Sequence, residues 1–203
     1  MSSLDELFDF YREECVPAYS DVVGYLAERP EQFLIEIENS FSHIAQYFNP
    51  ELEPEDREIN ISKAKDHLVR VTLDSYKLLW ILISQDLEEI YGDSFKRQFC
   101  VNLPQNEFSL KFQEFKRLAQ KARNLETSSV GVEPLRALEA YKETIALGRA
   151  LLEKIDQEKI ENSKSIRRFI STREFIIGLT TGFISGVLSS LLVAWLLNTL
   201  PGR

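Results

Sequence analysis

The sequence predicts an all-α protein in which a cytoplasmic helical bundle is followed by a helical stalk and a single C-terminal transmembrane helix. Two observations lead to this fold class. Apolar residues recur at three- and four-residue intervals along most of the chain, which is the helical period, and no stretch of useful length alternates as a strand would. In addition, residues 175–197 contain no charged side chain.

The uncharged run predicts a transmembrane helix over 174–198. At the helical rise per residue it is about 35 Å long, against roughly 30 Å for a hydrocarbon core. The alternative is a helix buried in the protein core, but such apolar runs are usually about 10 to 14 residues long. We therefore expect a tail-anchored chain whose residues 199–203 form a short extracytoplasmic tail.

The residues that flank the run predict its orientation. Basic residues precede it and only Arg203 follows it, so the positive-inside bias places the N-terminal side in the cytoplasm. The acidic N-terminus lacks an apolar segment, so no cleaved signal peptide is expected. The predicted location is a membrane crossed once. The flanking basic residues are Lys164, Arg167, Arg168 and Arg173.

Small residues in the same run predict association between copies of the chain. Small side chains four residues apart form one row along a helix and allow close backbone approach in lipid. This row consists of Gly178, Gly182, Gly186, Ser190 and Ala194. A second row, of Thr181, Ser185 and Ser189, is a candidate polar lining once several helices associate. The alternative is a monomeric anchor whose glycines recur by chance.

The remaining chain divides into a cytoplasmic helical bundle over 1–125, a linker over 126–133, and a long helix or stalk over 134–173 that completes the bundle. The central helix is expected at roughly 61–91, because its middle is apolar on every side. A three-four apolar spacing runs from Leu138 to Phe169 and is interrupted at Gly148, Lys159 and Asn162. Either its first half packs into the bundle and its second half is a solvated stalk, or the whole forms a parallel coiled coil between copies.

Composition excludes several functional classes. The two cysteines, Cys15 and Cys100, are far apart and form no zinc or disulfide pattern. No glycine-rich phosphate loop is present, and His43 and His67 lack partners at catalytic or metal-ligand spacing. We therefore expect no catalytic residues, no metal and no cofactor, and we expect that the protein is not an enzyme.

Charge is distributed unevenly along the 203 residues. Residues 1–59 hold fifteen acidic and three basic residues, whereas the whole chain has a formal charge of −8. The acidic front and the basic rear could pair within one chain or between neighbouring copies. The basic segment 109–125 could contact nucleic acid, but its phenylalanines and alanines fit a buried stripe, so nucleic-acid binding is not expected.

The stretch Glu58–Lys77, EINISKAKDHLVRVTLDSYK, resembles the long helix of HEPN-type helical domains of prokaryotic defence proteins. Nuclease members of that family carry an Arg, four to six residues, then His. Here Arg57 lies ten residues before His67, so that motif is absent. The resemblance implies a non-catalytic helical module.

Two functions fit these features. The first is a tail-anchored membrane effector, of the antiviral or abortive-infection type, that self-associates through the small-residue helix and permeabilises the membrane. The alternative is a membrane-anchored adaptor whose bundle recruits a soluble partner. The expected partners are membrane lipid, further copies of the chain and a cytoplasmic protein or signal.

Overall fold

The computed structural model describes residues 3–129 and 134–199, and this part is helical almost throughout. An isolated bridge between Val101 and Ile155 is the one extended pairing within these ranges. The prediction of an all-α fold is confirmed. In chain order the elements are α1 (Ser3–Phe10), the π-helical turn η1 (Tyr11–Cys15), α2 (Val16–Leu26), α3 (Glu31–Tyr47), α4 (Pro54–Gly92), α5 (Ser94–Phe99), α6 (Gln105–Ser129), the 3-10 turn η2 (Pro134–Ala137), α7 (Leu138–Leu152), α8 (Gln157–Glu161) and α9 (Ser163–Thr199).

Helix α4 is the centre of the bundle. It has 39 residues, so it is about 58 Å long. It begins earlier than the expected residue 61, because Pro54 suits the first helical turn and the acidic Glu55 and Asp56 that follow favour a helix N-terminus. Its buried side includes Leu79, Ile83 and Leu87, which lie in the segment predicted to be the bundle centre.

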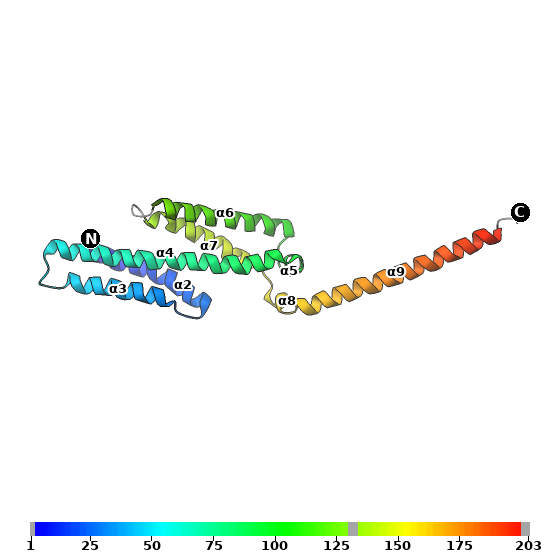
Figure 1. Cartoon of the computed structure of the whole chain (residues 1–203), viewed down its shortest axis with the longest axis horizontal. Coiled ribbons are helices and arrows are strands. Elements are labelled where there is room, and N and C mark those ends of the chain that lie inside the picture. Colours follow the sequence, from blue (N-terminus) through cyan, green and yellow to red (C-terminus); the bar gives the residue numbers. More distant parts are fainter. Residues whose placement is uncertain (1–2, 130–133, 200–203) are drawn as a thin grey trace.

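The other helices pack on two sides of α4 (Figure 1). Helices α2 and α3 lie along one side, and α7 lies along the other. Helix α6 packs mainly on α7, so it forms an outer layer. The side chains of Phe108, Phe112 and Phe115 on α6 are buried. This agrees with the buried stripe predicted for the basic segment.

Gly148 marks the closest approach of α7 to its neighbours. A Cβ atom added at Gly148 would lie 2.6 Å from Ile83 Cγ2 and 2.8 Å from Phe115 Cε2. Both neighbouring side chains are fully buried, so neither has free space into which it can move. The glycine that interrupts the apolar spacing in the sequence is therefore the point at which α4, α6 and α7 meet.

The segment predicted as one long helix and stalk is divided. Helix α7 ends at Leu152, and the chain then crosses beside residues 100–102, with Asn102 N–H donating to Lys154 O and Asp156 N–H donating to Cys100 O. Asp156 caps α8 by accepting a hydrogen bond from Lys159 N–H at 3.1 Å. Because Leu138, Tyr141 and Ile145 are buried in the bundle, the first half of the apolar spacing belongs to the core of one chain.

The prediction of a transmembrane helix over 174–198 is wrong. Within the residues that the structure describes, no helix is both long enough and apolar enough to cross a membrane. Helix α9 has 37 residues, and its first part carries the charged residues Lys164, Arg167, Arg168, Arg173 and Glu174, which a bilayer core accepts only at a high cost in free energy.

Predictions that depended on that span are corrected with it. These are the single-pass membrane location, the tail-anchored topology and the assignment of opposite membrane sides to the bundle and to residues 199–203. Residues 200–203 of the predicted tail and residues 130–133 of the predicted linker lie outside the described ranges. Residues 126–129 of that linker form the last turn of α6.

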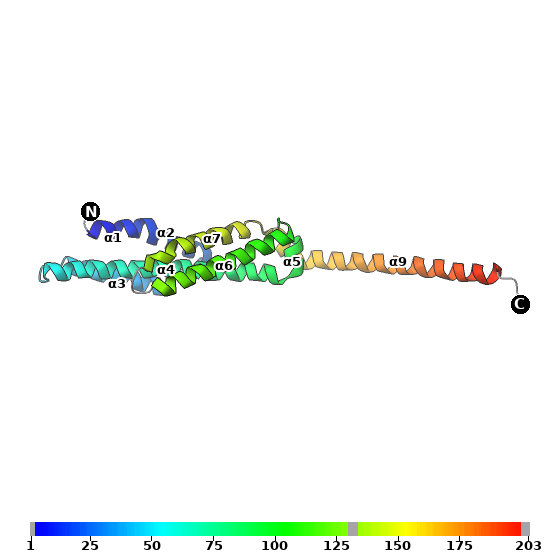
Figure 2. The same cartoon turned by 90° about the horizontal axis from the view of Figure 1, so that it is seen from above.

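Helix α9 projects from one end of the bundle (Figures 1 and 2). It leaves from the end where α5 and α8 lie, and the chain's N-terminus lies toward the opposite end. In both views α9 runs away from the other helices. The molecule is therefore a bundle with a long helical arm.

Candidate functional site: the exposed helix α9 and the pocket beside α8

Helix α9 exposes large apolar side chains to an unusual extent. Phe169 and Phe175 are each 69% exposed and Phe183 is 73% exposed. Ile176, Ile177, Leu179 and Ile184 are exposed as well. Single exposed apolar residues are ordinary, but a contiguous exposed apolar surface marks an interaction site. Such a surface is normally covered by a partner, and the described part of the single chain leaves it uncovered.

The free energy gained by covering these exposed side chains is large. Burial of one Leu, Ile or Phe side chain stabilises by about 1.5–3 kcal/mol. An isolated helix in water has little stability of its own and usually gains it by packing one face. Covering three or four of these side chains would therefore be a major part of the free energy of an association.

The predicted small-residue row is only partly described. Gly178 is open, because a Cβ atom there would meet nothing within 4 Å. Gly182, Gly186, Ser190 and Ala194 lie in α9, but their side-chain surroundings fall outside what the structure describes. Close approach of a second helix at Gly178 is therefore sterically open.

The hydroxyl row predicted as a polar lining is exposed, and one of its side chains is hydrogen-bonded to its own helix. Thr181 Oγ1 donates to the Ile177 carbonyl oxygen of its own helix at 2.8 Å. Ser185 and Ser189 are exposed. A hydroxyl bonded to its own helix backbone is already satisfied, so Thr181 requires no polar partner from another helix.

Arg167 ties the base of α9 to the bundle. Its Nη2 atom lies 2.8 Å from both carboxylate oxygens of Asp93, and its guanidinium lies 5.1 Å from the ring centre of Phe95. Of the four predicted basic residues, Arg167 is thus engaged by the bundle, whereas Lys164, Arg168 and Arg173 are exposed. This contact links the start of α9 to the bundle.

Asp93 is held as a carboxylate at this joint. Partial desolvation raises its pKa, but the backbone N–H groups of Lys96 and Phe95 and the Arg167 guanidinium outweigh that effect and lower it. The same carboxylate caps α5, accepting from Phe95 N–H at 2.9 Å. One side chain therefore links the start of α5 to the start of α9.

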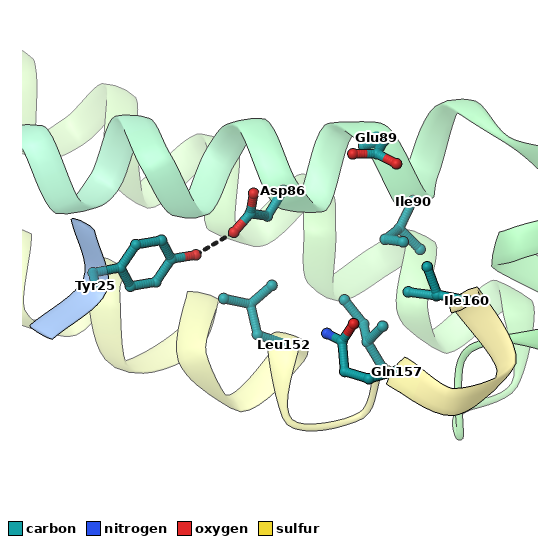
Figure 3. A pocket seen from close by; sticks show the side chains of 8 residues that line it. Tyr25, Asp86, Glu89, Ile90, Leu152, Gln157 and Ile160 are labelled. Atoms are coloured by element: carbon teal, nitrogen blue, oxygen red, sulfur yellow. Dashed lines mark hydrogen bonds between the residues drawn. The ribbon is translucent and has the colours of Figure 1, made fainter. Parts of the chain in front are cut away.

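A pocket lies beside α8 on the same end of the bundle (Figure 3). It encloses about 320 Å³, within the range of small-molecule sites. On one side the hydroxyl of Tyr25 donates a hydrogen bond to Asp86, and Glu89 lies at the rim. Ile90, Leu152 and Ile160 form the apolar side, with Gln157 near them.

The carboxylates and the tyrosine hydroxyl of this pocket are already hydrogen-bonded or ion-paired within the chain. Burial and the adjacent Asp86 carboxylate raise the pKa of Tyr25, so its hydroxyl stays protonated near neutral pH. Glu89 is occupied by Lys96. The pocket offers carboxylate acceptors above an aliphatic wall and contains no serine, cysteine or histidine that could serve as a nucleophile. Sequence reasoning missed it, because its lining comes from four segments that only the fold brings together.

His43 of α3 and His67 of α4 are in contact, which the sequence analysis did not predict. Their rings stack with centres 5.4 Å apart. His67 Nδ1 lies 2.6 Å from Glu36 Oε2, and His43 Nδ1 lies 2.9 Å from Asn60 Oδ1. A search of the described residues finds no group of three or more His, Cys, Asp or Glu that could hold a metal ion. The pair fits a structural contact between α3 and α4.

Comparisons with protein-family models, with curated proteins and with solved structures find no match to this chain. The resemblance of residues 58–77 to a HEPN-type helix therefore stays a prediction. In the structure Arg57 donates to the carbonyl oxygens of Leu52 and Pro50, so it supports the loop before α4.

Proposed function

We propose that this protein is a non-catalytic assembly module whose bundle displays α9 as a protein-pairing element, and that copies of the chain associate through α9. The observation that carries this proposal is the exposed apolar surface of α9, represented by Phe169, Phe175 and Phe183. Such a surface gains free energy when another protein covers it.

This proposal retains only part of the function expected from the sequence. Self-association was expected through a membrane-spanning helix, and that helix is excluded within the described residues. Membrane permeabilisation and membrane anchoring are therefore not carried forward. Association between copies and recruitment of a protein partner rest on α9 itself, because its described side chains are unpartnered in the single chain.

Sedimentation velocity of the full chain over a concentration series tests the proposal. We expect the wild-type chain to form oligomers, and Phe175→Glu and Phe183→Glu to shift it toward monomer, because each variant places a charge in the apolar contact. Leu110→Glu is the matched control, since Leu110 on α6 is 71% exposed. The control should associate as the wild type does, and all variants should retain wild-type helix content by circular dichroism.

Three results would overturn the proposal. The first is a wild-type chain that remains monomeric at every concentration. The second is equal association of the wild type and both α9 variants. The third comes from flotation with phosphatidylcholine–phosphatidylglycerol vesicles: a chain that binds vesicles but never another copy would show that lipid, not protein, covers α9.

A further inference from the structure

A second apolar surface lies on α1 and α3, toward the end of the bundle from which α9 does not project (Figure 1). It includes a small hollow with an almost entirely apolar lining, to which α1 contributes Leu7 and Phe8, and α3 contributes Phe41 and Ile44. Leu68 of α4 also lines it. We call this surface the α1–α3 groove.

The outer face of α3 extends this groove along the whole helix. Apolar residues recur there at alternating three- and four-residue spacing, so they lie on one stripe. The stripe consists of Leu34, Ile37, Phe41, Ile44 and Phe48. Phe41 is 58% exposed and Phe48 is 63% exposed. Phe33 and Ser40 lie beside this stripe and are buried against the bundle, and Ile37 and Ile44 are partly buried there as well. The uncovered part of the stripe is therefore Leu34, Phe41 and Phe48.

The charges of the two surfaces favour α9 as the helix that occupies the α1–α3 groove. Residues 1–59, which include α1 and α3, contain fifteen acidic and three basic residues. The start of α9 carries exposed Lys164, Arg168 and Arg173. A basic helix with an apolar continuation matches an apolar groove on an acidic surface, because opposite charges steer the encounter and apolar contact holds it.

The α9 of the same chain points away from this groove. It leaves from the α5 and α8 end, where Arg167 is bonded to Asp93. The groove lies on elements near the chain's N-terminus, toward the other end. A second copy of the chain can bring its α9 to the groove without breaking that bond.

We infer that α9 of one copy docks into the α1–α3 groove of the next copy. This inference rests on the proposed function, since it names the surface that α9 recognises. The contact is heterologous: each chain contributes one α9 and one groove, so successive copies add head to tail. Such contacts produce a ring if the rotation between copies closes, and an open chain if it does not.

A mixing experiment with two variants tests this inference. Phe175→Glu blocks α9 and leaves the groove intact, whereas Phe41→Lys blocks the groove and leaves α9 intact. We expect each variant alone to associate at least tenfold more weakly than the wild type. An equimolar mixture should form a 1:1 dimer and nothing larger, because one intact α9 then meets one intact groove. The readout is sedimentation velocity with the two variants carrying different fluorophores.

Controls separate this inference from the proposed function. Leu110→Lys should assemble as the wild type does, and Phe48→Lys replaces Phe41→Lys if the latter loses helix content. If Phe41→Lys and Phe48→Lys assemble normally while Phe175→Glu does not, α9 pairs elsewhere, so the inference fails and the proposed function survives. A mixture that gives no dimer also overturns the inference. Normal assembly of Phe175→Glu overturns the inference, and normal assembly of Phe183→Glu as well overturns the proposed function.

Discussion

At the scale of single residues, one partly buried carboxylate links three helices. Glu126 of α6 accepts a hydrogen bond from the Tyr141 hydroxyl of α7 at 2.7 Å and lies 3.0 Å from Lys77 Nζ of α4. Arg123 of α6 is bonded to it as well. Burial raises the pKa of Glu126, but Tyr141, Lys77 and Arg123 outweigh burial and lower it.

We predict that Glu126→Gln destabilises the bundle. The substitution removes the charge that Lys77 and Arg123 face, so the free energy of unfolding at pH 7 should fall by about 1–3 kcal/mol. Chemical denaturation measures this. Glu107→Gln is the control, because the pair between Glu107 and Lys111 is exposed and its loss should cost about 0–1 kcal/mol. Equal costs for the two variants would contradict a special role for Glu126.

The lowered pKa of Glu126 gives this contribution a pH dependence. A carboxyl group whose pKa is lower in the folded state stabilises above its unfolded pKa of about 4.3. That stability is lost as the pH falls through the folded value. The difference between wild type and Glu126→Gln should therefore shrink below about pH 4. A difference that stays constant down to pH 2 would show that charge is not the cause.

Gly148 gives a second prediction at this scale. Gly148→Ala forces a Cβ atom against Ile83 and Phe115, so we expect it to destabilise by about 1–3 kcal/mol despite alanine's better helix propensity. Gly24→Ala is the matched control, since its Cβ atom would meet nothing within 4 Å and it should stabilise by about 0.5–1 kcal/mol. Thermal unfolding of both variants measures these two changes in stability. Stabilisation by both would contradict the close packing at Gly148.

At the scale of elements, the joint between α9 and the bundle has few contacts. Helix α9 follows α8 after one residue, and Arg167 reaches back to Asp93 and Phe95. A helix attached at one end by so few contacts keeps its direction only while they persist. The direction of α9 is therefore more sensitive to a single substitution than the helices inside the bundle are.

We predict that Arg167→Gln broadens the range of α9 directions. Pulsed dipolar EPR between spin labels at Gln85→Cys on α4 and Thr172→Cys on α9 measures it, in a Phe175→Glu background to limit association. Cys15 and Cys100 are buried, and burial raises the pKa of both thiols, so they react slowly with the label. Arg168→Gln is the control and should leave the distance distribution narrow. Equally wide distance distributions for Arg167→Gln and Arg168→Gln would show that Arg167 does not restrict the direction of α9.

At the scale of the whole molecule, two unpartnered apolar surfaces of complementary charge lie toward opposite ends of an elongated protein (Figure 2). One is α9, with its basic start, and the other is the α1–α3 groove on the acidic part of the chain. This arrangement favours association between copies over closure within one chain, because α9 is directed outward.

Assembly should therefore depend on salt in a specific way. Screening shortens the electrostatic range from about 10 Å at 0.1 M salt to about 3 Å at 1 M. We predict that the association rate falls steeply over this range, while dissociation, governed by apolar contact, changes little. Stopped-flow light scattering measures both. The double variant Lys164→Gln, Arg168→Gln should show a flatter salt dependence, and an unchanged slope would contradict steering by these residues.

Several features of the fold were predictable from local pattern. The helical period predicts the helices, and the apolar middle of α4 predicts the bundle centre. Within that middle Leu79 and Ile83 are buried, whereas Ile81 is 42% exposed. Phe112 and Phe115 likewise predict the buried side of α6. The absence of charge in 175–197 predicted a transmembrane helix that the described residues do not contain.

The sequence by itself determined the all-α class and the central helix, because both follow from residue spacing along one helix. Only the tertiary structure decided what lies between helices. It joined Tyr25 and Asp86 into a pocket, stacked His43 on His67, and placed Gly148 between Ile83 and Phe115. It also left α9 and the α1–α3 groove uncovered in the single chain. The physical reason is that such contacts join residues far apart in sequence, whose proximity depends on how the helices pack rather than on the period within any of them.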